Sequence, residues 1–334
     1  MSRFTQLGND LYSGTRSFDF VGRRRRWYLI SIIVVIVCLS GPFLRGLATN
    51  SPAYNFGIEF TGGSEFIVSQ PATLDQGIAT NVVETIDHTV IPKVSTLGTD
   101  SIRVQTSQMT NAQTVEVKNA LAKAYSVPAT SVTSSFIGAT WGQDITGQAI
   151  RGLVVFIILA AIVMALYFRT WKMSVVAIIA LLHDVIITAG VYGLSGFEVT
   201  PGAVIGLLTI LGYSLYDTVV VFDKIRENTI GVSRDMSRSF GQQVNLAVNQ
   251  TLVRSINTSV VAALPVAAIL FIGAFILGAG TLRDISLALL IGIIVGTYST
   301  LFLAAPLYAG WRSRDKSVAD ADKKILAAQE RAAA

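Results

Sequence analysis

The stretch PGAVIGLLTILGYSLYDTVVVF, residues 201–222, decides the fold. It is apolar apart from a few polar side chains and one carboxylate, Asp217. A helix needs about 20 mostly apolar residues to cross a bilayer, and this stretch is long enough. Its first residue, Pro201, suits the start of a helix because the missing N–H would have no partner there. The sequence therefore predicts a membrane-spanning helix from Pro201 to about Phe222.

Five more apolar runs of similar length surround this one, over residues 27–44, 152–168, 173–196, 254–283 and 284–312. The composition agrees, because 51% of the 334 residues are apolar and 14% are charged. A soluble domain usually carries about 25% charged residues. The mean hydropathy of the chain is +0.56. We therefore predict a polytopic α-helical membrane protein with six transmembrane helices.

Lysine and arginine predict the direction of the chain, because they gather on the cytoplasmic side of membrane proteins. One side of the predicted bundle collects the basic residues of segment 1–26, Arg169, Lys172, those from Lys224 to Arg238, and those of the tail 312–334. The opposite side has only Arg45, Arg151 and Arg283 near the bilayer. We therefore expect a multi-pass protein of the cytoplasmic (inner or plasma) membrane with both termini in the cytoplasm.

The run Arg23 to Arg26 and the net charge of +5 fit the same interpretation. These arginines abut a spanning helix, so contact with anionic membrane lipids explains them better than nucleic acid does, and we predict no nucleic-acid partner.

A basic segment before an apolar run is also typical of a signal peptide. Because this run is long and Arg45 stands near the place of a cleavage site, we expect a retained anchor.

A polar segment, residues 48–145, separates the first two spans and is too long for a plain loop. Its patterns predict strands at 64–68, 101–105 and 132–137 and helices at 74–90 and 111–125. Thr110 is placed to cap the second helix. The order β-α-β-α-β predicts a small α/β, ferredoxin-like domain on the extracytoplasmic side.

The expected organisation follows from these segments. It comprises a cytoplasmic N-terminal segment (1–26), the first transmembrane helix (27–47), the extracytoplasmic domain (48–145), transmembrane helices two to six with a cytoplasmic loop near 224–253 (146–311), and a cytoplasmic tail (312–334).

The residues that most often carry catalysis or bind metals are scarce, since there are one cysteine and two histidines. No nucleophile with a base, phosphate loop or metal cluster stands out, so we predict neither an enzyme nor a cofactor.

Charged side chains inside a span are costly and usually functional. Asp217 lies roughly 24 Å from the start of its span, still within the hydrocarbon core. Tyr213 and Ser214, one turn before it, extend a polar stripe that must face protein. Arg254 opens the fifth span and shares its face with Thr258. An arginine there can pair with a carboxylate on a neighbouring helix.

These residues predict a proton relay. Burial favours the neutral form of Asp217 and a nearby arginine favours the charged form, so a group held between the two can change protonation when helices move. A static buried salt bridge between Asp217 and Arg254 explains the same residues equally well. Asp184, inside the third span, either joins this polar core or makes a hydrogen bond that packs two helices.

Five motifs then point to one family: FDFVGRRRRWY at 18–28, FGIEFTGG at 56–63, SLYDTVVVFDKIREN at 214–228, RSINTS at 254–259 and GIIVGTYSTLFLAAPL at 292–307. In this order and with this topology, the chain resembles the SecF branch of the SecD/SecF family of protein-export membrane proteins, within the RND superfamily. The resemblance covers nearly the whole chain. The second motif supplies the family positions Phe56, Gly57, Glu59, Thr61, Gly62 and Gly63.

The resemblance implies one six-span half of an RND-type assembly whose other half is SecD. It implies that the proton gradient drives the pair to pull on a translocating polypeptide, after the SecA motor has pushed it into the SecYEG channel. The family's transmembrane aspartate and functional arginine fall on Asp217 and Arg254. The chain departs from the family pattern at Glu59, where aspartate is usual, and at Tyr216, where asparagine is common.

Two other functions stay open. One is half of an RND exporter of lipids or small molecules, which the soluble insert disfavours because it is too small to form a substrate tunnel alone. The other is a scaffold that stabilises the translocon without moving protons. Asp217 discriminates between the scaffold and the proton-driven role, because only the latter requires a protonatable group.

Overall fold

A computed structural model describes residues 3–168, 170–229, 237–276 and 280–333. Arg169 and residues 230–236 of the expected loop near 224–253 lie outside the described residues. The elements on the N-terminal side are α1 (Arg3–Ser13), α2 (Arg24–Thr49), β1 (Asn55–Phe56), α3 (Ile58–Thr61), β2 (Gly63–Ser69), α4 (Gln76–Ile86), β3 (Lys93–Leu97), β4 (Ser101–Thr106), α5 (Asn111–Ala124) and β5 (Val132–Ile137). The remainder are α6 (Ala139–Phe168), α7 (Trp171–Ser195), β6 (Glu198–Val199), α8 (Pro201–Thr229), α9 (Phe240–Ala268), α10 (Gly280–Tyr298), α11 (Ala305–Arg312) and α12 (Lys316–Ala333).

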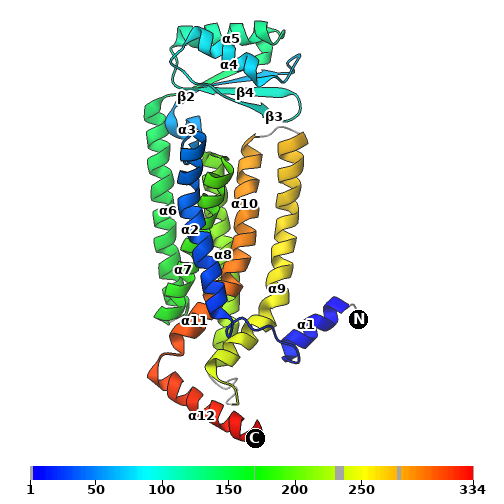
Figure 1. Ribbon diagram of the computed structural model, residues 1–334, viewed down its shortest axis with the longest axis vertical. Helices are drawn as coiled ribbons and strands as arrows, with labels where there is room; N and C mark the ends of the chain where they lie inside the picture. The colour runs from blue at the N-terminus through cyan, green and yellow to red at the C-terminus, as the bar shows by residue number, and fades with distance from the viewer. Residues whose placement is uncertain (1–2, 169, 230–236, 277–279, 334) are drawn as a thin grey trace.

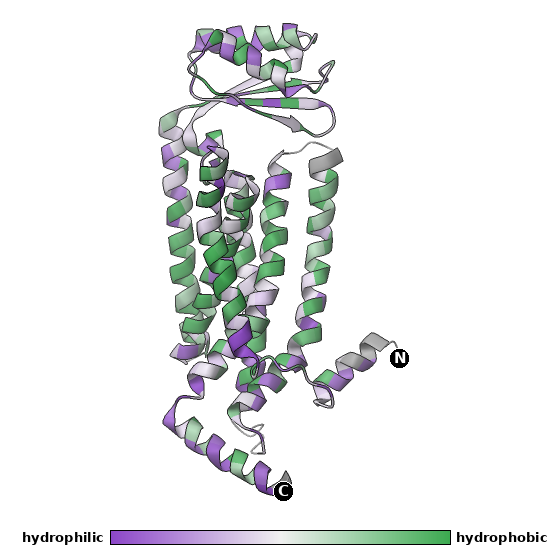
Figure 2. Cartoon of the chain, viewed as in Figure 1, coloured by the Kyte–Doolittle hydropathy of each residue, from purple (hydrophilic) through white to green (hydrophobic). Residues whose placement is uncertain are grey.

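Six long apolar helices form a bundle, with a small sheet domain at one end and α12 at the other (Figure 1). Within the described residues, six helices are long and apolar enough to cross a membrane, as predicted. Figure 2 shows the apolar residues along the middle of the bundle and hydrophilic ones toward its ends. The helices extend beyond the expected spans, because α6 begins at Ala139, α8 continues to Thr229 and α9 begins at Phe240. Much of the expected loop near 224–253 is therefore helical.

Helix α8 and helix α10 pack closely through small residues. A Cβ added at Gly206 of α8 would lie 2.7 Å from the carbonyl oxygen of Ile285. From the other side, a Cβ at Gly292 of α10 would lie 2.5 Å from Ile210, and one at Gly296 would lie 2.9 Å from Ser214 Oγ. Residues spaced as GxxxG thus bring the two backbones together, which is how helices associate in lipid.

The soluble domain is an antiparallel four-stranded sheet in the order β3-β4-β2-β5, with α4 and α5 on the face away from the bundle (Figure 1). Its core includes Phe66, Ile102, Val104 and Tyr125. Because side chains alternate across a strand, the opposite face of β2 and β4 points toward the bundle. Thr110 caps α5 through a reciprocal pair of hydrogen bonds with Gln113, as predicted.

The predicted order β-α-β-α-β was wrong by one strand. The structure adds β3, which gives β-α-β-β-α-β, the element order of split β-α-β folds. The segment Lys93–Leu97 is an edge strand with mostly exposed side chains, so it lacks the apolar alternation from which strands are predicted.

The segment before α2 is tied to α9. Asn249 Oδ1 accepts from the backbone N–H of Phe18 at 2.7 Å, and Asn245 Oδ1 accepts from that of Phe20 at 2.8 Å. At the other terminus, Asp322 of α12 accepts from the N–H of Phe240, the first residue of α9. Both ends of the chain therefore hold the same helix.

Candidate functional site

Helix α8 carries a buried carboxylate at membrane depth. Asp217 is 8% exposed, and its Oδ1 accepts a hydrogen bond of 2.8 Å from Ser255 Oγ of α9. Its Oδ2 is buried and has no hydrogen-bond partner among the described residues. Among the described residues, Asp217 therefore accepts from one hydroxyl and has no cation within salt-bridge distance.

A second carboxylate lies nearby on α7. Asp184 is 2% exposed, and its Oδ2 accepts from Ser214 Oγ of α8 at 2.5 Å. Its Oδ1 lies 3.4 Å from Nδ1 of His183. Ser214 and Asp217 are three residues apart on α8, so both carboxylates belong to one group of side chains. We call Asp184, Ser214, Asp217 and Ser255 the core cluster.

Two further hydroxyl pairs extend the core cluster along the same helices. Thr218 Oγ1 lies 2.9 Å from Thr300 Oγ1, and Ser259 Oγ lies 2.5 Å from Thr297 Oγ1. Thr300 belongs to a π-helical segment, Ser299–Ala304, that joins α10 to α11. Such segments often occur at functional positions in helices.

Arg254 does not form the direct salt bridge with Asp217 that one of the two sequence interpretations required. Its side chain is exposed on the outside of α9, and its Nη2 donates to Tyr216 Oη at 3.3 Å. Between the described residues Asp217 and Arg254 there is no salt bridge within 4.0 Å. The neighbouring Ser255 faces Asp217 instead, and sequence reasoning missed it.

The remaining predicted members of the polar core lie at its edge. Thr258 donates to the backbone carbonyl of Arg254 within its own helix, and Tyr213 is half-buried. Tyr216 is 54% exposed. Arg254, Tyr216 and Asn257 thus form an exposed polar strip on α8 and α9 at membrane depth. Polar groups in this position require a protein neighbour, because lipid cannot satisfy them.

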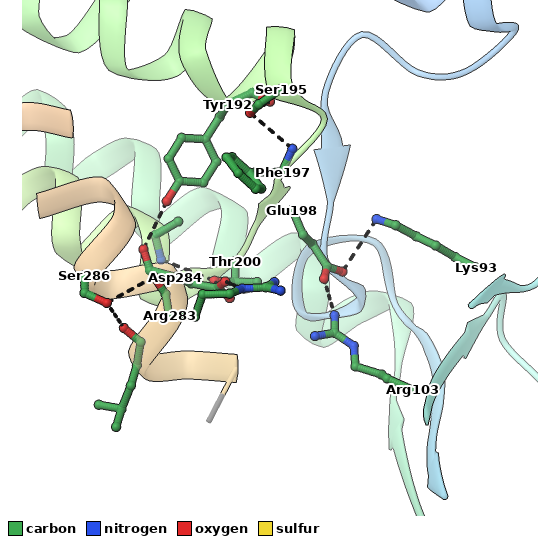
Figure 3. A network of polar contacts seen from close by, with 12 residues as sticks. Lys93, Arg103, Tyr192, Ser195, Phe197, Glu198, Thr200, Arg283, Asp284 and Ser286 are labelled. Atoms are coloured by element: carbon green, nitrogen blue, oxygen red, sulfur yellow. Dashed lines mark hydrogen bonds and ion pairs between the residues drawn. The ribbon is translucent and has the colours of Figure 1, made fainter. Parts of the chain in front are cut away.

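A different polar cluster joins the soluble domain to the bundle (Figure 3). Arg103 of β4 makes a salt bridge to Glu198 of β6 and another, of 2.9 Å, to Glu65 of β2. Lys93 Nζ lies 4.0 Å from Glu198. Glu198 is 7% exposed and Arg103 is 8% exposed. We call Glu65, Lys93, Arg103 and Glu198, with Thr200 and Asp284, the junction cluster.

Thr200 and Asp284 connect the junction cluster to the helices. Thr200 Oγ1 donates to Asp284 Oδ2 of α10 at 2.8 Å and accepts from the N–H of Ala203 in the first turn of α8. Arg283 Nε lies 3.2 Å from Asp284 Oδ1. Residues 198–200, which lead directly into α8, are therefore held by the sheet on one side and by α10 on the other.

The motif FGIEFTGG lies beside this cluster. Phe56 pairs with Val199 in a two-stranded parallel ladder, and the N–H of Gly57 donates to the carbonyl of Val199 at 2.9 Å. Burial raises the pKa of Glu59, and the charges of Glu198 and Glu65 add to the effect. Thr61 closes the short helix α3.

Two glycines of the motif form the link into β2. Gly62 has φ of 74° and Gly63 has φ of 151°, values that favour glycine. A Cβ at Gly62 would lie 2.9 Å from Cα of Ala139, the first residue of α6. The two connections of the sheet to the bundle, before β2 and after β5, are therefore adjacent.

The chemistry available to these clusters is limited. Within the described ranges there is no group of three or more His, Cys, Asp or Glu side chains that could hold a metal ion. Cys38, the one cysteine of the chain, is buried. The core cluster can take up and release a proton at a carboxylate, and the junction cluster can hold two parts of the fold together by charge.

Comparison with known proteins settles the family. A family model described as protein export membrane protein SecD/SecF, C-terminal, matches residues 116–314. The chain belongs to the SecD/SecF family. The SecF translocase subunit of Streptomyces coelicolor is 42% identical over all of this chain and 87% of its own length. That of Mycobacterium tuberculosis H37Rv is 41% identical over 95% of this chain and 72% of its own length.

A solved structure agrees with this membership. The crystal structure of SecDF, a translocon-associated membrane protein of Thermus thermophilus, has a TM-score of 0.76 and 28% identity over 90% of this chain. This SecD/SecF chain spans 39% of that protein. Family membership confirms the expected multi-pass helical class and a role as an auxiliary subunit in protein export.

Proposed function

We propose that the protein works with SecD and uses the proton gradient to drive or complete the passage of a polypeptide through the Sec channel. The observation that supports this most directly is the environment of Asp217. It is a buried carboxylate at membrane depth that, within the described part of the chain, has one hydroxyl donor and one oxygen without a hydrogen-bond partner. A buried charge without a salt-bridge partner is costly at this depth, so uptake of a proton stabilises the site and its release destabilises it.

SecD is the proposed partner of the exposed polar strip. In the Thermus thermophilus relative the name SecDF joins the two proteins in one chain. The strip of Arg254, Tyr216 and Asn257 needs a covering helix, and a SecD helix with a carboxylate would complete the relay around Arg254. The edge strand β5 needs cover as well, because Val132–Ile137 has no charge and, among the described strands, pairs only with β2.

The other parts of the proposal follow from the family and from the charge pattern. The SecYEG channel and the SecA motor are the proposed further partners, and the membrane is the cytoplasmic one, with both termini in the cytoplasm. We propose no enzymatic activity for the protein itself. The gradient supplies the energy, with no cofactor, and any ATP is hydrolysed by another subunit.

The test is Asp217→Asn in inner-membrane vesicles that contain SecD, the channel and SecA. We expect translocation with a proton gradient to fall to the rate without one, because asparagine cannot take up a proton. The control is Asp223→Asn, which removes an exposed carboxylate from the same helix and should leave the stimulation intact. Full stimulation in Asp217→Asn at normal protein level would instead favour the scaffold function.

A further inference from the structure

The soluble domain meets the bundle at two separate places. One is covalent, at the adjacent segments Gly62–Gly63 and Gly138–Ala139, next to β2 and β5. The other is the salt bridge from Arg103 of β4 to Glu198, on the side of the sheet toward β3. A sheet attached in this way can pivot at the glycines, and the salt bridge determines how far it tilts.

Beside Arg103, the described side chains leave a gap between the sheet and the helices. A cavity of about 330 Å³ lies between the sheet and the start of α8 and α10, lined by Glu59, Glu65, Arg103, Thr200 and Asp284 among others. Leu97, near Gly280, makes one apolar contact across this gap. Among the described residues, the salt bridge of Arg103 with Glu198 is the main polar contact on this side of the domain.

Glu198 lies three residues before the start of α8, and Asp217 lies on the same continuous helix. Thr200 also bonds to Asp284, so the segment between Glu198 and α8 has little freedom to move independently. A shift or rotation of α8 at Asp217 must displace Glu198. Arg103 would follow, because this buried charge cannot leave its partners without a large loss of stability.

We propose that Glu198 and Arg103 are the positioning residues through which movement of α8 reaches the soluble domain, which pivots about Gly62–Gly63. The salt bridge stays closed throughout and acts as a rigid link. Glu65 orients Arg103 toward Glu198 from within the sheet. This inference rests on the proposed proton-driven function and identifies the contact that turns protonation into domain movement.

The test compares domain position with and without a charge at residue 217. Spin labels are attached to cysteines replacing Thr99, exposed between β3 and β4, and Leu47, 82% exposed at the end of α2. The native Cys38 is buried and stays unlabelled. In the complex with SecD in nanodiscs, Asp217→Asn should shift the label-to-label distance when Glu198 is present. In Glu198→Gln the shift should vanish.

Gradient-stimulated translocation is measured in parallel. Glu198→Gln keeps the shape of the side chain and leaves Arg103 paired with Glu65. We therefore expect a folded protein with a lower melting temperature, an unchanged rate without a gradient and at least a fivefold loss of stimulation. Arg103→Lys, made on its own, should keep part of the stimulation, because a positive charge still faces Glu198. The matched control is Asp315→Asn, which removes a carboxylate paired with Lys172 and Arg312 at the other end of the bundle. It should keep full stimulation.

The outcomes separate the two proposals. If Glu198→Gln lowers only the melting temperature and keeps both the distance shift and the stimulation, the salt bridge is merely structural and the inference is wrong. The same holds if Asp217→Asn abolishes stimulation without any distance shift in the presence of Glu198. If Asp217→Asn leaves stimulation intact, the proposed function fails, and the inference that rests on it fails too.

Discussion

The core cluster and the junction cluster both place carboxylates in the interior of the protein, but they give them different partners. In the core cluster, Asp217 and Asp184 accept hydrogen bonds from serine hydroxyls. In the junction cluster, Glu198 and Glu65 meet the guanidinium of Arg103. One helix, α8, contributes to the first and is directly preceded by a residue of the second.

The difference in partners separates two tasks. A carboxylate that faces a cation keeps its charge, since losing it would leave the cation buried and unpaired. A carboxylate that faces a hydroxyl can be satisfied in either protonation state, because a hydroxyl both donates and accepts. The core cluster is therefore suited to exchanging a proton, and the junction cluster is suited to holding a fixed contact.

The two core carboxylates allow the first test of this difference. Asp184→Asn should keep stimulation by the gradient within about threefold of normal, because asparagine still accepts the Ser214 hydrogen bond with a loss of about 1 kcal/mol. Asp217→Asn should reduce stimulation at least tenfold. Translocation rates in matched vesicles measure both. Equal losses would mean that the proton is shared by the whole core cluster.

The packing of α8 on α10 provides the second test, because both clusters depend on it. In Gly206→Ala the new Cβ meets the Ile285 carbonyl at 2.7 Å and the Ala288 side chain at 2.9 Å. Overpacking of this kind costs about 1–3 kcal/mol, so the melting temperature of the purified protein should fall. Stimulation should fall with it, since the helices that connect the clusters are pushed apart.

Gly212→Ala is the matched control for that substitution. It lies on the same helix, and a Cβ there would have no neighbour within 4 Å. The higher helix propensity of alanine should leave its stability unchanged or raise it by up to about 1 kcal/mol. Equal effects at the two glycines would show that helix propensity, and not contact with α10, determines the outcome.

Much of the fold was predictable because each span and most strands have their own local pattern. Pro201 begins α8, Thr110 caps α5, and the alternation at 64–68 marks β2. The rotation of a helix about its axis could not be predicted in this way, because it depends on the helices that pack against it. Arg254 and Ser255 are adjacent, about 100° apart around α9, and the sequence does not tell which of them faces Asp217.

The junction cluster could not be predicted for a related reason. Arg103 and Glu198 are 95 residues apart, and each lies in a segment with an ordinary local pattern. Only the packing of the sheet over the start of α8 brings them together. Glu198 offered a weak signal, as an acidic side chain directly before a spanning helix, yet the same position at a bilayer surface suits a solvated charge.

The smallest expected effect concerns Glu59, the carboxylate beside the junction cluster whose Oε2 is buried without a partner among the described residues. Its pKa is raised by burial and by the charges of Glu198 and Glu65, so folding favours the neutral form. The stability this gives is present below the unfolded pKa, near 4.3, and is lost as pH rises through the folded pKa. Glu59→Gln should therefore melt about 2 °C higher than the native protein at pH 7, with no difference near pH 4.

The control is Glu65→Gln, which removes a partner of Arg103 and should melt lower than the native protein at pH 7. If Glu59→Gln also melted lower at pH 7, Glu59 would act as a charged partner of Arg103, and the junction cluster would share its cation among three carboxylates.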